Sequence, residues 1–322
     1  VSSTMENWYT REESETDPGF GCVPENRSPD KLLQKGIILI DKPFGPTSSQ
    51  VTTWIREELN LDKAGHFGTL DPNATGVLPI GIESGTRMNN LLSSSRKEYV
   101  FLAELEDSVD DEEIRENLLS MKGTNRQVPP EKSAVKREER EREMYEAELL
   151  ETRQKKVLGR IECEAGFYVR VMIQDLAERL NTGGKMEELR RTRQGSIHER
   201  ETCTVQEAVD AYHFHKNGNS REIKKVLHPI ERAIENTPKI VIKDSAVNAV
   251  ANGADLGCAG VSKLQGGISP GDRVAVTTLK GELVAVGQAE MSSQNIYDGE
   301  GTAVSLESVH IDPETYPKRW KQ

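Results

Sequence analysis

The sequence predicts an α+β protein made of an extended arm over residues 1–35, a larger domain over residues 36–236 and a small β-barrel over residues 237–322. The chain has 322 residues, which suits roughly two domains. In the larger domain, segments with the two-residue period of strands alternate with segments that have the period of helices. In the last region, short alternating segments separated by glycines are typical of a β-barrel of about 80 residues.

The first elements follow from local composition. Residues 1–35 hold four basic and seven acidic residues together with several prolines and glycines, so we expect an arm without a core of its own. Residues 36–41 are an apolar run of strand length. Thr47 or Ser48 caps the helix that we expect next. Four apolar residues share one face of that helix at helical spacing: Val51, Trp54, Ile55 and Leu59.

The remaining elements are predicted from periodicity in the same way. Residues 97–105 alternate between apolar and polar side chains and predict a strand. Residues 108–121 begin with carboxylates, which suit the positive end of a helix dipole, and predict a helix. Residues 157–163 predict another strand, and a turn at Ala165-Gly166 leads into a further helix. In the last region, we expect strands at residues 240–242, 273–277 and 283–288.

The charge balance argues against a protein that binds nucleic acid through its whole surface. The formal net charge is −11, from 42 basic and 53 acidic residues, whereas general nucleic-acid binders are normally basic. Two segments differ from this average. Residues 126–145 hold six basic and five acidic residues, and we expect a solvated loop there. Residues 189–195 contain three arginines, which suit either phosphate binding or an exposed charged face.

The four cysteines and six histidines show no spacing typical of metal ligands or of a disulfide framework. We therefore expect free thiols and no metal site. No apolar run approaches the length of about 20 residues that a membrane-spanning helix needs, and the N-terminus lacks the pattern of a signal peptide. These features predict a cytoplasmic protein without a membrane segment.

Residues 63–79 are the stretch most informative about chemistry. They form a glycine-rich loop that presents one carboxylate, Asp71, directly before Pro72. The proline biases Asp71 toward an extended conformation, and the loop glycines allow another backbone or a ligand to come close. From these residues alone, Asp71-Pro72 also fits an ordinary turn.

This loop resembles the catalytic loop of the TruB-type pseudouridine synthases. Nearly the whole chain resembles the archaeal and eukaryotic dyskerin-type branch, which is the catalytic subunit of H/ACA guide-RNA particles. Other family motifs occur in the family's order, namely the opening lysine–proline motif, the segments that bear the active-site tyrosine and arginine, the arginine-rich motif and the PUA RNA-binding domain. They are resembled by residues 39–48, 96–100, 166–170, 189–195, 243–247 and 252–256.

The resemblance implies a mixed-sheet pseudouridine synthase domain, a PUA β-barrel on which the arm packs, and isomerisation of uridine to pseudouridine in rRNA or tRNA without a cofactor. It assigns three catalytic residues. Asp71 either adds to the sugar or removes a sugar proton. Arg170 provides the counter-charge that keeps a carboxylate ionised in a closed pocket. Tyr99 holds the detached uracil, and its hydroxyl helps to move the C5 proton. The target uridine must be flipped out of the RNA to reach Asp71.

The same resemblance nominates residues for RNA binding. They are Lys42, His66, Lys132, Lys136, Arg190, Arg191 and Arg193. His66 fits equally well a hydrogen-bonded loop histidine. Two features depart from the family pattern: Phe67 is bulkier than usual, and residues 138–143 are more acidic than expected next to the thumb-like segment at 128–137.

Three readings follow for the function. The first is a guide-RNA-dependent synthase subunit, and the second is a stand-alone synthase acting on the T-loop of tRNA. The third is a non-catalytic RNA-binding scaffold in ribosome biogenesis, against which Asp71, Tyr99 and Arg170 argue together. For the first reading, the resemblance implies guide and substrate RNA, a small protein along the catalytic domain, a glycine-arginine-type regulator and a kink-turn-binding protein as partners. The location would be cytoplasmic, or nucleolar in a eukaryote.

Overall fold

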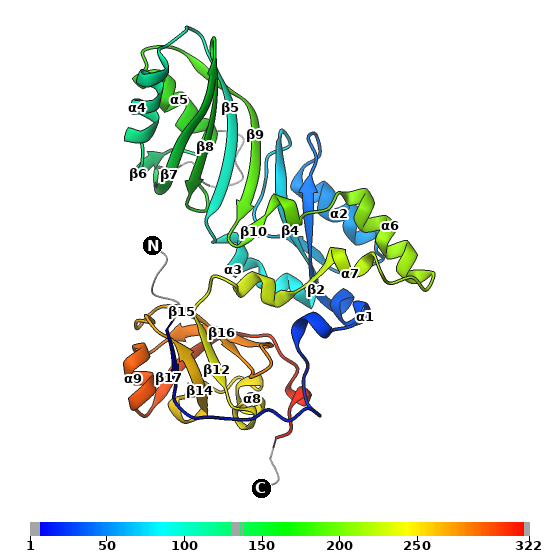
Figure 1. The fold of residues 1–322 in the computed structure, drawn as a ribbon. Coiled ribbons are helices and arrows are strands. Elements are labelled where there is room, and N and C mark those ends of the chain that lie inside the picture. The colour runs from blue at the N-terminus through cyan, green and yellow to red at the C-terminus, as the bar shows by residue number, and fades with distance from the viewer. Residues whose placement is uncertain (1–6, 130–135, 137, 319–322) are drawn as a thin grey trace. The chain divides into compact units, whose positions relative to one another are not determined.

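The structure, a computed structural model, describes residues 7–129, 136 and 138–318 (Figure 1). Its contacts divide the chain into two compact units, one formed by Val1–Ser28 with Pro229–Gln322 and the other by Pro29–His228. The sequence-based boundaries, after residues 35 and 236, lie seven and eight residues later. The short helix α1 (Pro29–Gln34) belongs to the second unit because its Leu32 is buried in that unit's core.

The unit Pro29–His228 is built on one mixed sheet. Its strands are β2 (Lys35–Lys42), β3 (Ala64–His66), β4 (Ala74–Glu83), β5 (Lys97–Leu105), β6 (Gly123–Gln127), β7 (Arg140–Arg153), β8 (Lys156–Cys163), β9 (Gly184–Gln194), β10 (Ile197–His198) and β11 (Leu227–Pro229). The order is β11-β2-β4-β9-β5-β8-β7-β6, while β3 pairs with β4 and β10 with β9. Strands β4 and β9 run parallel, whereas β2–β4 and β5–β9 are antiparallel, which confirms the mixed sheet.

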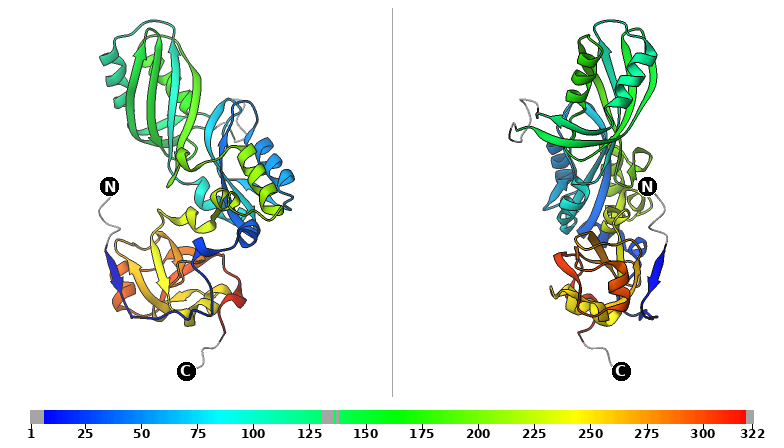
Figure 2. Two further views of the ribbon diagram at one scale, coloured as in Figure 1. Left: turned by 45° about the vertical axis from the view of Figure 1, so that its right-hand side comes forward. Right: turned by 90° about the vertical axis from the view of Figure 1, so that its left-hand side faces the viewer.

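The helices of this unit bury their apolar faces in two cores. Besides α1 they are α2 (Ser48–Glu58), α3 (Asn89–Ser93), α4 (Asp111–Ser120), α5 (Val169–Arg179), α6 (Val205–Lys216) and α7 (Ile223–Val226). Helices α2 and α6 pack on each other and on β2–β4, and α4 and α5 pack against the strands from β5 to β9 (Figures 1 and 2). Within the described residues, no helix is long and apolar enough to cross a membrane.

Most elements expected from periodicity are present. Strand β5 alternates between buried and half-buried residues along its whole length, as predicted. Helix α2 is capped by Thr47, and Val51, Ile55 and the C-cap residue Leu59 are buried, whereas Trp54 is 43% exposed and does not share their burial. The expected loop at 126–145 is wrong in part, because β7 already begins at Arg140 and pairs with β6. Cross-strand ion pairs such as Arg126–Glu141 (3.3 Å) make charged side chains compatible with strands there.

The other unit is the expected β-barrel with the arm added at its edge. Its strands are β1 (Trp8–Thr10), β12 (Lys239–Ile242), β13 (Leu256–Gly257), β14 (Val261–Gln265), β15 (Arg273–Thr277), β16 (Leu283–Ala289) and β17 (Thr302–Val309), and its helices include α8 (Asp244–Ala251) and α9 (Ser293–Asp298). The sheet order is β1-β14-β12-β15-β16-β17-β13. Strand β1 of the arm pairs antiparallel with β14, so the arm completes this sheet.

Candidate active site

Asp71 and Arg170 form an ion pair on the unit Pro29–His228. The Arg170 guanidinium donates from one terminal nitrogen to Asp71 Oδ2 at 2.7 Å. Asp71 lies in the loop between β3 and β4, and Arg170 lies in the first turn of α5. The Asp71 side chain is 59% exposed and that of Arg170 is 40% exposed. The two residues therefore meet as expected, but the closed pocket inferred around Asp71 is wrong for this free chain.

The backbone on both sides of Asp71 is fixed by buried side chains. Ser48 Oγ donates to the carbonyl of Leu70 at 2.9 Å and accepts from the Leu70 amide at 2.8 Å. On the other side, Lys42 Nζ donates to the carbonyls of Pro72 (3.1 Å) and Ala74 (2.8 Å). Because each contact joins positions 22 or more residues apart, the loop is held by the tertiary fold and not by its own sequence.

Lys42 was expected to bind RNA, and its position contradicts this. Its side chain is completely buried and bonded to carbonyl groups of the loop. Burial lowers the pKa of its ammonium group, and the nearby charge of Asp71 partly opposes that shift. Lys42 therefore contributes a positive charge beneath the loop without facing solvent.

Arg191 has a similar place in the structure, and its expected RNA contact is also wrong. The side chain is completely buried, and it donates to the carbonyls of Val77 (2.7 Å) and Gly68 (3.1 Å). Gly68 precedes Asp71 in the loop and Val77 follows it. One buried guanidinium therefore bonds the backbone on both sides of Asp71. The close approach of β4 and β9 requires glycine at Gly76, where φ is +100° and a Cβ would lie 2.2 Å from the Arg191 carbonyl oxygen.

Tyr99 lies on β5 directly opposite Arg191 on β9. It is only 7% exposed, and burial is the main cause that raises the pKa of its phenol, although the charge of Arg191 opposes the rise. Asp71 adds a smaller electrostatic contribution in the same direction as burial, and the Tyr99 side chain belongs to the same core cluster as Leu70, the residue before Asp71. At neutral pH the Tyr99 hydroxyl is therefore protonated.

The contacts of Arg190 and Arg193 bear on whether the arginine-rich segment at residues 189–195 binds phosphate or forms an exposed charged face. Arg190 bonds both carboxylate oxygens of Asp41 (2.9 and 3.0 Å) and also reaches Glu199 at 2.6 Å. Arg193 lies 3.2 Å from Glu162 and 3.4 Å from Glu98. Each arginine thus faces two carboxylates, which neutralise its charge locally. Both side chains join β9 to other parts of the sheet through these ion pairs, and the RNA contact expected for them stays a prediction.

His66 and Phe67 lead into the loop from β3. Burial, with a contribution from Arg191, lowers the pKa of His66, so its imidazole is neutral at pH 7. Within the described part of the chain, His66 Nδ1 is buried and has no hydrogen-bond partner. The bulk of Phe67 is accommodated completely, because its ring lies over Gly81, where a Cβ would come within 2.3 Å of Phe67 Cζ.

The two remaining RNA-binding candidates belong to the thumb-like segment. Lys136 is exposed, as an RNA contact requires. Lys132 lies outside the described residues.

Some residues important for the site carried no signal in the sequence. Gln127 on β6 is buried, accepts from the Tyr168 amide at 2.9 Å and donates to the Tyr168 carbonyl at 3.1 Å, which fixes the entry to α5 two residues before Arg170. Ser48 lies at the end of the lysine–proline motif, but the only role considered for its side chain was that of a helix cap, which Thr47 takes. In both cases the partner lies far away in the chain, so no local pattern marks the residue.

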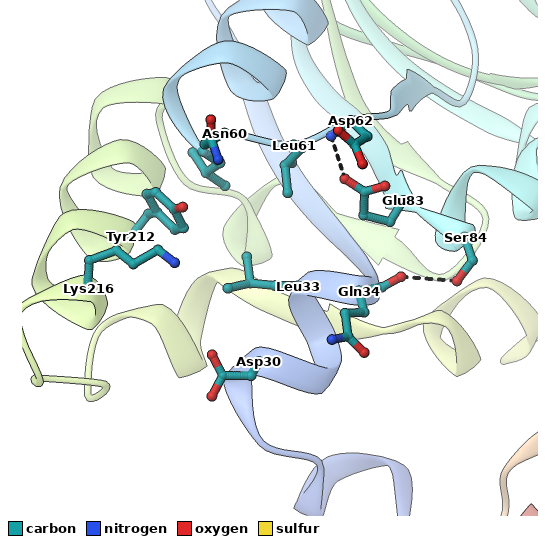
Figure 3. Close-up of a pocket in the computed structure, with 11 residues that line it drawn as sticks. Asp30, Leu33, Gln34, Asn60, Leu61, Asp62, Glu83, Ser84, Tyr212 and Lys216 are labelled. Carbon is teal, nitrogen blue, oxygen red and sulfur yellow. Dashed lines mark hydrogen bonds between the residues drawn. The ribbon is translucent and has the colours of Figure 1, made fainter.

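The site therefore presents the exposed carboxylate of Asp71 on a loop that three buried polar side chains hold in place, those of Ser48, Lys42 and Arg191. Within residues 7–129, 136 and 138–318, no group of three or more His, Cys, Asp or Glu residues is placed to hold a metal ion. A cavity of about 570 Å³ lies elsewhere in this unit, among α1, the end of α2 and α6, where Asp30, Leu33 and Lys216 line it (Figure 3). None of Asp71, Tyr99 and Arg170 lines that cavity.

Comparison with known proteins covers nearly the whole chain. Residues 56–169 match the TruB family pseudouridylate synthase N-terminal domain, and residues 170–235 match the tRNA pseudouridylate synthase B C-terminal domain. Residues 238–310 match the PUA domain and residues 3–52 the DKCLD domain. These matches follow one another along the chain in the order that the sequence motifs predicted.

Individual relatives agree with these matches. The chain is 43% identical over 319 residues to a protein of Methanocaldococcus jannaschii named "Probable tRNA pseudouridine synthase B", covering 98% of this chain and 95% of the relative. It is 46% identical over 312 residues to a Pyrococcus abyssi protein of the same name, covering 96% and 93%. Both relatives are matched along almost their full length.

Solved structures give the same result. A chain of a "Cbf5-Nop10-Gar1 Complex" superimposes with a TM-score of 0.94 at 43% identity, covering 99% of this chain and 98% of that one. A chain of an "H/ACA RNP bound to a substrate RNA containing 2'-deoxyuridine" has a TM-score of 0.92 at 42% identity, covering 98% and 97%. The chain belongs to the TruB family of pseudouridylate synthases and carries a PUA domain.

Proposed function

We propose that this protein isomerises uridine to pseudouridine in RNA as the catalytic subunit of an H/ACA-type guide-RNA particle. The observation that carries the proposal is the ion pair between Asp71 and Arg170, placed on a loop that buried Ser48, Lys42 and Arg191 hold rigidly. A scaffold protein without catalytic activity has no use for an exposed carboxylate that is oriented in this way.

The reaction needs few groups. The N1–C1′ bond breaks, a C5–C1′ bond forms, the C5 proton leaves and N1 gains a proton, so no electrons enter or leave and no co-reactant is needed. Asp71 either adds to C1′ or removes a proton from the sugar. Arg170 orients the carboxylate, and we assign to Tyr99, which packs in the same core cluster as Leu70 beside Asp71, the role of holding the detached uracil. Because burial keeps the Tyr99 hydroxyl protonated, it can move a proton only by relaying one.

Assembly into a particle is supported by the structural relatives, whose chains occur with Nop10, Gar1 and a substrate RNA. We extend this to a small protein along the catalytic unit, a glycine-arginine-type regulator and a kink-turn-binding protein, with rRNA or tRNA as substrate and a cytoplasmic location, or a nucleolar one in a eukaryote. The names of the curated relatives specify tRNA, which favours tRNA as the substrate. The second candidate is therefore a stand-alone enzyme acting on tRNA, for which we propose the T-loop as the target.

The catalytic proposal is tested with Asp71→Asn, which keeps the shape of the side chain and removes its charge. We expect no detectable pseudouridine with near-normal RNA binding, because Asp71 forms its ion pair on the surface and holds no part of the core. Pseudouridine is mapped in the RNA after single-turnover incubation. Retained turnover would show that another group does the chemistry.

Guide dependence is tested separately. Purified chain is incubated with a tRNA transcript alone, and then with guide RNA and the partner proteins added. A particle subunit modifies its target only, or far faster, when guide RNA is present. Equal modification of the T-loop uridine without guide RNA favours the stand-alone enzyme.

A further inference from the structure

Phe44 is the most exposed large apolar side chain among the described residues, at 65%. It lies in the loop between β2 and α2, within the consecutive exposed positions 43–45. A single exposed apolar residue needs no special explanation by itself. The position of this one, however, is tied to the catalytic loop by hydrogen bonds.

Two contacts bring Phe44 next to Asp71. The amide of Gly45, the residue after Phe44, donates to the carbonyl of Pro72, the residue after Asp71, at 2.9 Å. Lys42 Nζ joins the same two segments, because it donates to the carbonyls of both Pro43 (2.9 Å) and Pro72 (3.1 Å). Residues 71–73 are exposed like residues 43–45, so the adjacent segments that carry the aromatic ring and the carboxylate are both open to solvent.

The loop that carries Phe44 is rigid. Pro43 and Pro46 restrict the backbone on both sides, and Gly45 adopts φ = +110°, a conformation that glycine accepts without strain. Thr47 closes the loop with a capping box, in which its side chain and that of Gln50 bond each other's backbone amides. A loop backbone held in this way loses little conformational entropy when a ligand covers it.

We propose that Phe44 stacks on the nucleobase that neighbours the target uridine in the substrate RNA. This inference rests on the proposed function and adds to it a substrate contact outside the chemical step. When the uridine is flipped toward Asp71, the base next to it loses a stacking partner. An aromatic ring carried on this rigid loop next to the Asp71 segment can replace that partner, and any base offers a face to it.

The test is a double-mutant cycle on the assembled particle, which contains the full chain, its partner proteins and a guide RNA. Equilibrium binding of a substrate oligonucleotide is measured for the unaltered chain and for Phe44→Ala, with matched oligonucleotides that are abasic on the 5′ or the 3′ side of the target uridine. We expect Phe44→Ala to weaken binding of the intact RNA roughly 5- to 150-fold, the range for one base–aromatic stack. For one abasic RNA, both proteins should bind with equal affinity.

Two further variants serve as controls. Phe44→Tyr keeps the ring and should keep the affinity. Phe214→Ala removes another exposed aromatic side chain, 51% exposed on α6, and should leave binding unchanged. The proposal is overturned if Phe44→Ala binds intact RNA like the unaltered chain, if its loss is the same for all three RNAs, or if Phe214→Ala causes an equal loss. Turnover by the unaltered particle is recorded in parallel, so a failure of the proposed function is seen separately from a failure of the stacking contact.

Discussion

At the scale of single residues, the bulk of Phe67 is matched by the absence of a side chain at Gly81. Phe67 directly follows β3, and Gly81 lies on β4, the strand that pairs with β3. Phe67 is completely buried, and its amide donates to the carbonyl of Pro79 at 2.9 Å. A feature that departs from the family pattern in the sequence is thus absorbed by a complementary glycine in the core.

Gly81→Ala is therefore expected to destabilise the unit Pro29–His228. Its Cβ would lie 2.3 Å from Phe67 Cζ and 2.8 Å from the Gly85 carbonyl oxygen, and such overpacking costs about 1–3 kcal/mol. Gly65→Ala is the matched control, since Gly65 pairs with Gly81 across the strands and its nearest neighbour, Thr86 Cγ2, is 3.7 Å away. Urea unfolding measures both variants. Equal stability of the two would show that the ring moves aside freely.

Arg170 has a different role from the one expected for a closed pocket. Because water reaches both partners of its ion pair with Asp71, the pair contributes only about 0–1 kcal/mol to stability. Its value lies in orienting the carboxylate toward the substrate, and misplacement of a reacting group can lower a rate by about 100-fold.

We predict that Arg170→Met lowers the single-turnover rate about 100-fold or more, while the free energy of unfolding changes by less than about 1 kcal/mol. Arg179→Met, on the exposed face of the same helix α5, should retain normal turnover and serves as the control. Rates are measured with saturating RNA on preassembled particles. If the single-turnover rate of Arg170→Met is within a few-fold of normal, Arg170 is not required to orient the Asp71 carboxylate.

At the scale of elements, strand β5 begins with a buried lysine whose protonation affects stability. Lys97 is 5% exposed and donates to the carbonyls of Ser95 (2.7 Å) and Ser93 (2.8 Å). Burial, together with the charge of Arg191, lowers the pKa of Lys97 to about 7 from its ordinary value of 10.5. Between these two values, the unfolded chain binds a proton that the folded chain does not.

The sign of the pH dependence follows directly. Below about pH 7, Lys97 is protonated in both the folded and the unfolded chain, and its buried charge lowers the free energy of unfolding by the full amount. As the pH rises from 7 toward 10.5, Lys97 loses its proton in the folded chain, and this destabilisation decreases. Unfolding free energy relative to Lys97→Met should therefore increase between pH 7 and pH 9. Lys156→Met, at the exposed start of β8, should show no such trend. Urea titrations at several pH values measure the difference, and a flat difference for Lys97 would contradict the lowered pKa.

Elements were predicted better than side-chain environments. The alternation in β5 and β8 and the apolar face of α5 reflect burial along a single element, which local sequence reports directly. The arginines of β9 are different, since Arg190 meets Asp41 and Arg193 meets Glu98, residues 149 and 95 positions away. A charge pattern reveals that arginines are present but not which distant carboxylates neutralise them. For the same reason, nothing local indicated that Lys42 and Arg191 are buried.

The meeting of Asp71 and Arg170 was predicted, whereas the residues that support them were missed. The catalytic roles of Asp71, Tyr99 and Arg170 stay predictions. Asp71 and Arg170 were brought together only by the resemblance, because 99 residues separate them. Gln127 and Ser48, which fix the backbone beside these residues, bond distant main-chain groups. Every residue has the same main-chain groups, so a sequence pattern does not reveal which distant residue such a side chain bonds.

At the scale of the whole chain, the arm and the barrel form one unit although 200 residues separate them. Strand β1 pairs with β14, and the rings of Tyr9 and Tyr297 lie 5.7 Å apart. Further along the arm, Thr16 Oγ1 donates to Asp244 Oδ2 at 2.9 Å, at the start of α8. The arm ends with Arg27, whose guanidinium bonds the buried carboxylate of Glu231 at 2.7 and 2.9 Å.

Deleting residues 1–28 alone should therefore destabilise the barrel and promote aggregation, because it leaves β14 as an open sheet edge and uncovers apolar surface. Deleting residues 229–322 as well should leave a folded, monomeric unit of residues 29–228, because that unit has its own cores. Calorimetry and light scattering compare the full chain with residues 29–322 and 29–228. If residues 29–322 melt at the same temperature as the full chain and stay monomeric, the arm is an accessory and not a structural part of the barrel.

A milder variant, Arg27→Met, should lower the free energy of unfolding by about 3 kcal/mol, because it leaves the Glu231 carboxylate buried without its cation.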